Sequence, residues 1–192
     1  LAEELGISFY DDEILSMTAE KSAVGEKYFR LADEKAGNNL LRKIVGNLRF
    51  PAGIFEEPKK EGDVTSPDNL FRFQAEVIRE LASAESCVIV GRCADVILKD
   101  YHPLNLFVYA DAESKIQRCI DRAPEGEHLS RNDIARRMKQ VDKNRAQYRQ
   151  MFADSKWGAK ETYHLCVNTS GHQIKDLIPG LAAFVRCWYG EK

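Results

Sequence analysis

An arginine follows a buried strand in the segment CVIVGRCADVIL, residues 87–98. The first four residues are apolar and predict an interior strand, after which Gly91 and Arg92 follow directly. Glycine at a strand exit permits a sharp turn or a close approach to a ligand, and a guanidinium group binds phosphate through two parallel hydrogen bonds. Gly91 and Arg92 are therefore predicted to bind an anionic substrate. The alternative is that Arg92 forms a surface ion pair with Asp95.

Two other predicted strands also end in polar residues. Asp11 and Asp12 follow a strand predicted at 7–10, and the strand predicted at 164–170 ends in the sequence Asn-Thr-Ser. Ligands of parallel sheets bind at the carboxyl ends of the strands. These polar groups are expected to lie at the same edge as Arg92.

A basic segment covers residues 115–149, and arginine outnumbers lysine in it. Its arginines are Arg118, Arg122, Arg131, Arg136, Arg137, Arg145 and Arg149. Four of them form two pairs with the spacing i, i+4, which places the members of each pair on one helix face. Asp142 lies three residues before Arg145 and is expected to orient its guanidinium group toward a phosphate. The alternative is a solvated helix face with ordinary ion pairs.

Hinge-like residues precede the second half of this segment. The stretch APEGEHLS contains proline and glycine, and its last residue, Ser130, has the side chain of a helix N-cap. A basic hairpin between hinges is typical of a closing lid, which we place at residues 123–150.

Strands and helices alternate along the chain. The predicted strands are 7–10, 87–90, 104–110 and 164–170, and the predicted helices are 26–35, 39–48, 67–84, 94–99, 112–122 and 173–188. This order predicts an α/β fold with a mainly parallel sheet, and residues 23–67 form a helical insert. The segment LAEELG reads as the end of a helix capped by Gly6, so the natural chain is expected to continue upstream.

Composition narrows the class of protein. The chain has 192 residues, 28 Lys and Arg, 30 Asp and Glu, and a formal net charge of −2, which fits one domain and does not indicate a nucleic-acid or membrane partner. Five separated cysteines without a Cys-x-x-Cys pair predict reduced thiols. No apolar run approaches a membrane span of about 18 residues. We expect a cytoplasmic protein, and the sequence leaves a homodimer open.

Four stretches carry a resemblance to a known family. FYDDEIL, FQAEVIRELASAESCVIVGRCADVIL, VDKNRAQYRQMF and KWGAKETYHLCVNTS together resemble the cytidylate kinase-like family of P-loop nucleoside monophosphate kinases. The resemblance implies a three-layer fold with helices on both faces of the sheet, an acceptor-binding insert and an arginine-rich lid. It also implies ATP and Mg²⁺ as cofactors and transfer of the ATP γ-phosphate to CMP, dCMP or a similar acceptor.

The resemblance assigns roles to the residues singled out above. It implies that Arg92, with Gly91, Asp95 and Asp11 beside it, binds the acceptor. The aspartate and last arginine of the lid motif match Asp142 and Arg145. The remaining catalytic candidates are Arg118, Arg122 and Arg149, and Arg137 is a further substrate-binding candidate.

The chain departs from the family pattern at several positions. The first lid arginine falls on Met138, so Arg137 or Arg149 would replace it, and Val90 and Cys93 stand where the family has aspartates. The metal ligands therefore stay unknown. A Gly-x-x-x-x-Gly-Lys-Ser/Thr loop is absent from the sequence, so the first strand and the P-loop are expected upstream of the given residues. Two alternatives follow: a nucleotide-binding regulator with impaired catalysis, or a kinase for another small acceptor.

Overall fold

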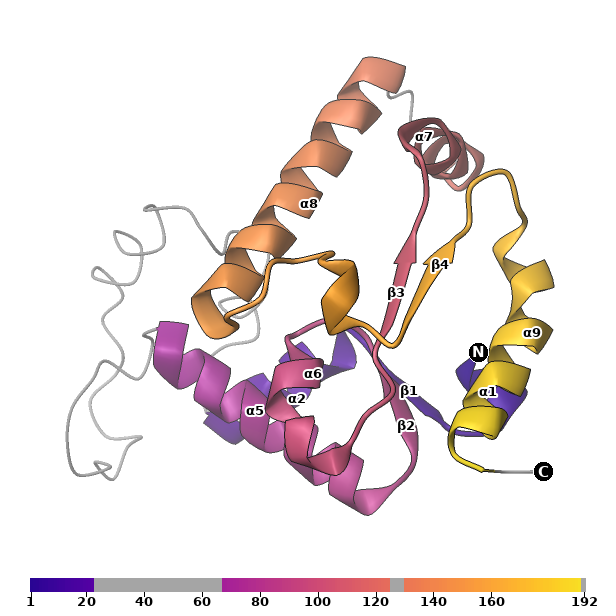
Figure 1. Cartoon of the computed structure of the whole chain (residues 1–192). Coiled ribbons are helices and arrows are strands. Elements are labelled where there is room, and N and C mark those ends of the chain that lie inside the picture. Colours follow the sequence, from indigo (N-terminus) through magenta and orange to yellow (C-terminus); the bar gives the residue numbers. More distant parts are fainter. Residues whose placement is uncertain (23–66, 125–129, 191–192) are drawn as a thin grey trace, which may run out of the picture.

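The computed structural model describes residues 1–22, 67–124 and 130–190 as alternating helices and strands (Figure 1). In chain order the elements are α1 (Ala2–Leu5), β1 (Ser8–Tyr10), α2 (Glu13–Ser22), α5 (Pro67–Ala84), β2 (Cys87–Ile89), α6 (Ala94–Ile97), the 3₁₀ turn η1 (Lys99–Tyr101), β3 (Leu106–Tyr109), α7 (Ala112–Asp121), α8 (Arg131–Phe152), η2 (Lys160–Thr162), β4 (Leu165–Asn168) and α9 (Ile174–Trp188). The α/β class is confirmed. The insert predicted at 23–67 lies outside the described residues up to Pro67, where α5 begins.

All four described strands pair in parallel, but they form two sheets. β1 pairs with β2, with Ser8 opposite Cys87, and β3 pairs with β4, with Leu106 opposite Leu165. The predicted parallel pairing is confirmed for the described strands, which form two separate pairs. The ladder hydrogen bonds of each strand run to its one partner, so no bonded strand joins β2 to β3 among the described residues.

The N-terminal and C-terminal helices pack together. α1 packs against α9 and β1, and Gly6 closes α1 with the left-handed φ of 68° that the sequence predicted for a C-cap. In Figure 1, α9 and α1 lie on one side of the strands, and α2, α5 and α6 lie together on the other. The sequence ends of the described chain are thus brought side by side.

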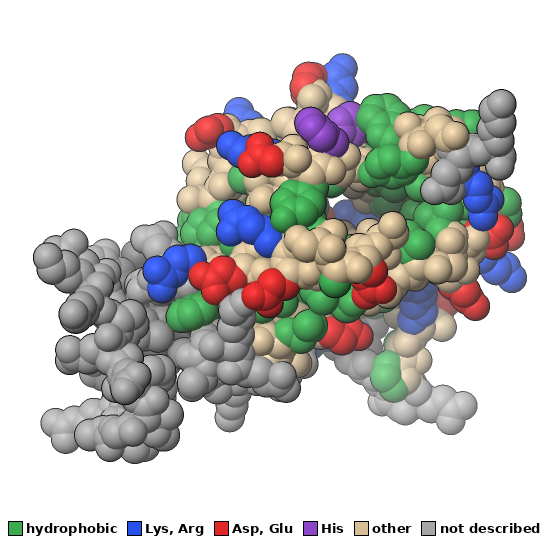
Figure 2. Space-filling view, turned by 90° about the horizontal axis from the view of Figure 1, so that it is seen from below, with side chains coloured by type: hydrophobic (Ala, Val, Ile, Leu, Met, Phe, Trp, Pro, Cys, Tyr) green, Lys and Arg blue, Asp and Glu red, His purple; other side chains and the backbone are tan. Residues whose placement is uncertain are grey.

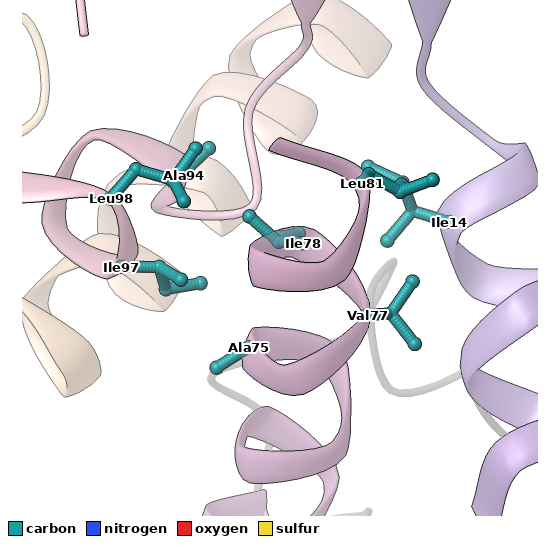
Figure 3. Close-up of a cluster of buried hydrophobic side chains, with 8 residues drawn as sticks. All are labelled: Ile14, Ala75, Val77, Ile78, Leu81, Ala94, Ile97 and Leu98. Carbon is teal, nitrogen blue, oxygen red and sulfur yellow. The ribbon is translucent and has the colours of Figure 1, made fainter. Parts of the chain in front are cut away.

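The hydrophobic core lies between α2, α5 and α6. In Figure 3, Val77 and Leu81 of α5 point toward Ile14 of α2, whereas Ile78 points toward α6. Ile14 and Ile78 are completely buried. The i, i+3, i+4 spacing of apolar residues gives α5 two buried sides, because helices pack against both of them. The core therefore fixes α5 directly beside the strand exit at Gly91.

The basic segment forms two helices that pack against each other. α7 ends at Asp121, and α8 is one continuous helix of 22 residues, about 33 Å long, that begins after Ser130. The predicted N-cap is confirmed, because the Ser130 hydroxyl accepts a hydrogen bond of 3.2 Å from the Asp133 N–H. In Figure 1, α8 extends from α7 to α5 and α6.

Charge on the surface is mixed in sign. On the face shown in Figure 2, Lys and Arg side chains lie among Asp and Glu side chains. Within residues 1–22, 67–124 and 130–190, no helix has the length and apolar character needed to cross a membrane.

Replacement of the central core residue tests this packing. We expect Ile78→Ala to lower the free energy of unfolding by about 3 kcal/mol, because the substitution removes a completely buried side chain and leaves a cavity. Urea denaturation measures the change. The matched control is Ile120→Ala, whose side chain on α7 is 36% exposed, and an equal loss in both variants would contradict the assigned core.

Candidate active site

The chain turns in a left-handed conformation directly after β2. Gly91, Arg92 and Cys93 have φ values of 71°, 57° and 53°, and the Ala94 N–H closes the turn on the Gly91 carbonyl at 3.0 Å. The left-handed conformation costs roughly 1–2 kcal/mol for each non-glycine residue. Strained backbone of this kind is concentrated at functional sites. The turn thus supports a functional role for Gly91 and Arg92.

The Arg92 side chain lies beside Asp12, which follows the end of β1. Its side chain is only 9% exposed, and its guanidinium group donates to Asp12 Oδ1 at 3.3 Å. Burial lowers the pKa of Arg92, and the nearby Tyr148, Asp11 and Asp12 act against this effect. The alternative pairing of Arg92 with Asp95 is wrong, because Asp95 binds another arginine.

Asp11 and Arg145 complete this group, which we call the Arg92 cluster: Asp11, Asp12, Arg92 and Arg145. Burial is the main cause that raises the pKa of Asp11, and the charge of Asp12 adds to it. The positive charges of Arg92 and Arg145 lower the same pKa. Arg145 on α8 therefore acts electrostatically on the strand exit, although it lies far from that exit in sequence.

The predicted contact between Asp142 and Arg145 is present. Asp142 Oδ1 accepts a hydrogen bond of 3.3 Å from Arg145, and Asp142 Oδ2 accepts one of 2.9 Å from Lys115 Nζ on α7. The Arg145 side chain is 61% exposed, which leaves it accessible to a ligand. Asp142 thus joins α7 to α8 and binds Arg145.

Arg149 lies in a buried ion pair. Its guanidinium group donates to both carboxylate oxygens of Asp95, at 3.0 and 2.8 Å, and to the Ser155 hydroxyl at 2.7 Å. The Arg149 and Asp95 side chains are 7% and 19% exposed. We interpret the pair as the connection between α8 and α6, because these contacts occupy both groups.

Arg118 binds the loop after β4. Its guanidinium group donates to Thr169 Oγ1 at 3.0 Å, to the Thr169 carbonyl and to the His172 carbonyl at 3.1 Å. In the same loop, Ser170 Oγ accepts a hydrogen bond from the Asp111 N–H at 2.8 Å. The polar residues after β3 and β4 thus form a second group, separate from the contacts of the Arg92 cluster.

The other two predicted arginines lie on the surface. Arg122 is the C-cap of α7, and Arg137 lies on an exposed part of α8, about two turns before Arg145. Both are accessible to a ligand at the α7–α8 side of the molecule.

Sequence reasoning missed two residues that touch the site. Gln74 on α5 is 4% exposed and donates through Nε2 to Tyr148 Oη at 2.9 Å and to the Arg92 carbonyl at 3.3 Å. The signal was a single polar residue among the apolar positions of α5, next to Ala75. Tyr148 follows Arg145 by three residues, so the two lie on one face of α8.

The cluster also fits a magnesium ion bound through phosphates. Among the described residues, no three His, Cys, Asp or Glu side chains gather closely enough to hold a metal alone. Mg²⁺ in phosphoryl-transfer sites is held by one or two carboxylates together with substrate phosphates and water. Asp11 and Asp12 are adjacent carboxylates whose repulsion such a cation would reduce.

The observed class is an α/β protein in which one strand exit and one long helix bring arginines together. The profile of the cytidylate kinase-like family matches residues 1–171, so the chain belongs to that family, as the sequence predicted. A crystal structure of an uncharacterized protein from Eubacterium ventriosum ATCC 27560 is similar, with 25% identity and a TM-score of 0.64. The match covers 97% of this chain and 87% of that one. The comparison with curated proteins finds no match.

The buried ion pair can be tested by stability. We expect Arg149→Met to lower the free energy of unfolding by about 3 kcal/mol, because it leaves the half-buried Asp95 carboxylate without its cation. Thermal and urea unfolding measure the loss, and the double variant with Asp95→Asn should recover part of it. The control is Arg136→Gln, which removes an exposed ion pair with Asp133 on the same helix. Equal stability of Arg149→Met and the wild type would contradict the structural role.

Proposed function

We propose that the protein is a nucleoside monophosphate kinase-like phosphotransferase that moves the ATP γ-phosphate to CMP, dCMP or a similar acceptor. The observation that carries the proposal is the nearly buried guanidinium group of Arg92, which lies beside two carboxylates and within the electrostatic influence of Arg145. Family membership supports kinase chemistry in general. The cluster supports an acceptor that carries a phosphate.

Arg92 would bind the acceptor phosphate. The planar guanidinium fork matches phosphate oxygens, and Asp12 accepts a hydrogen bond from it at 3.3 Å. An acceptor phosphate oxygen attacks the γ-phosphorus of ATP, the bond to the β–γ bridging oxygen breaks, and ADP leaves with that electron pair. The charge on the transferred group spreads over its oxygens in the transition state, so its stabilisation requires fixed positive charge.

Arg145 would supply that charge from α8. Asp142 orients it through the 3.3 Å hydrogen bond, and the exposed guanidinium group keeps donors for a phosphate. Asp11 and Asp12 would hold Mg²⁺ together with the substrate phosphates; when bound, the ion neutralises phosphate charge. Together these residues would allow two polyanions to approach each other.

Most of α8 would belong to the lid predicted at 123–150. Arg137 in this lid and Arg122 directly before it are both exposed, and we propose that they approach the ATP phosphates when the lid closes. Arg118 and Arg149 would act as positioning residues instead, because their guanidinium groups bind the β4 loop and Asp95. The acceptor-binding insert at 23–67, the kinase-like three-layer fold and an upstream P-loop stay predictions.

A second candidate function is a nucleotide-binding regulator with impaired catalysis. Burial raises the pKa of the Cys93 thiol to about 11, so this residue is uncharged at neutral pH. It cannot replace the carboxylate that the family resemblance places there. Val90, which is 43% exposed, likewise offers no metal ligand where an aspartate is expected. These two positions favour the regulator.

A coupled ADP-release assay separates the two functions. The natural full-length protein is assayed with ATP, Mg²⁺ and each nucleoside monophosphate in turn. We expect turnover with CMP or dCMP, and a fall in kcat of roughly a thousandfold in Arg145→Ala, because the charge near the transferred group is lost.

Arg136→Ala is the matched control, since Arg136 is an exposed arginine of α8 outside the Arg92 cluster. Its kcat should equal that of the wild type. ATP binding without turnover for any monophosphate would contradict the kinase and favour the regulator.

A further inference from the structure

One buried side chain connects the strand exit to α8. Gln74 of α5 is 4% exposed, and its amide nitrogen donates to the Arg92 carbonyl at 3.3 Å and to Tyr148 Oη at 2.9 Å. A primary amide has two N–H donors, so one group can make both bonds. Removal of either bond would leave a buried polar atom without its hydrogen-bond partner, which lowers the stability of the fold.

The first bond acts on strained backbone. Arg92 and Cys93 are left-handed residues with β-carbons, at φ 57° and 53°. Such a turn persists only when surrounding contacts stabilise it. The Gln74 amide holds the carbonyl at the middle of the turn, and the guanidinium group of Arg92 leaves the chain from the same residue. The direction of the phosphate-binding group therefore depends on the Gln74 bond.

The second bond depends on how α8 packs. The Phe71 ring of α5 stacks on Phe152 with a centroid distance of 4.0 Å, and Tyr148 packs against both rings, at 6.4 and 5.0 Å. This aromatic group fixes the Tyr148 ring, so its hydroxyl reaches Gln74 only when the end of α8 is packed on α5. Burial raises the pKa of Tyr148, so the hydroxyl stays neutral and keeps its proton.

We propose that Gln74 is a positioning residue that couples the packing of α8 to the conformation of Arg92, a role that rests on the function proposed above. When Tyr148 occupies its place, the Gln74 amide is held toward Arg92, and Arg145 lies on the same face of α8 as Tyr148. Binding of an acceptor phosphate at Arg92 stabilises the same arrangement, because coupling between two sites is reciprocal. Acceptor binding at Arg92 and packing of α8 on α5 thus stabilise each other through the Gln74 amide.

Steady-state kinetics of the full-length protein test the coupling with three variants. Gln74→Met keeps the side-chain length and removes the amide, and Tyr148→Phe removes only the hydroxyl. Tyr101→Phe is the matched control, because the Tyr101 hydroxyl also bonds a side chain of α5, Ser83, at 3.0 Å. We expect both test variants to raise the KM for CMP about tenfold and to leave the KM for ATP unchanged. A tenfold change in affinity corresponds to the free energy of one buried hydrogen bond. The control should match the wild type.

An Arg92→Gln background, which lacks the phosphate-binding guanidinium group, distinguishes positioning from general loosening. If Gln74 acts through Arg92, then Gln74→Met causes no further rise in the KM for CMP in that background. An additional tenfold rise there, or equal changes in the KM values of CMP and ATP, would overturn the proposal while leaving the kinase function intact.

Hydrogen exchange tests the coupling if the wild type shows no turnover. Absence of turnover would contradict the proposed function but not the coupling. Amide exchange of residues 91–93 and 141–152 would then test whether Gln74 couples the two segments. Faster exchange in both segments for Gln74→Met and for Tyr148→Phe, with no change in Tyr101→Phe, supports it. Faster exchange in only one segment, or in neither, overturns it.

Discussion

The buried ion pair between Arg149 and Asp95 constrains where the longest described helix lies. α8 contacts α7 near its beginning, through Arg131 and Glu113, and α6 at its end, through Arg149 and Asp95. A buried pair of charges is stable only when both partners keep their hydrogen bonds. Because α6 follows directly after the left-handed turn at Gly91, this pair fixes α8 relative to the strand exit.

The chemistry of the site follows from that geometry. The two strand pairs are separate sheets in the described part of the chain, and α8 extends from the helix after β3 to the helices beside β2. The positive charge of Arg145 on α8 therefore acts on Asp11 and Arg92 from another part of the fold. Positioning and fixed charge are the main contributions of a protein to phosphoryl transfer. A helix that can be held in place, or released, can therefore control such a reaction.

Local features of the fold were predictable because they depend on neighbouring residues. Hydrophobic spacing predicted the helix at 67–84 and the strand at 87–90. Residue type predicted the helix caps, with glycine at position 6 and serine at position 130. The partners of single charges were not predictable, because they are set by packing between distant segments. Asp95 lies close to Arg92 in sequence, yet it binds Arg149, and the bridging role of Gln74 requires three elements to meet. The division into two sheets is likewise a matter of long-range pairing.

Binding of a phosphate at Arg92 can be measured directly by calorimetric titration of the natural full-length protein with CMP and with cytidine. If the guanidinium group binds the acceptor phosphate, CMP binds about 100-fold more tightly than cytidine, and the ratio falls about tenfold or more in Arg92→Gln. Cytidine affinity should be the same in both proteins. An equal ratio of affinities in the wild type and in Arg92→Gln would contradict a phosphate site at the exit of β2.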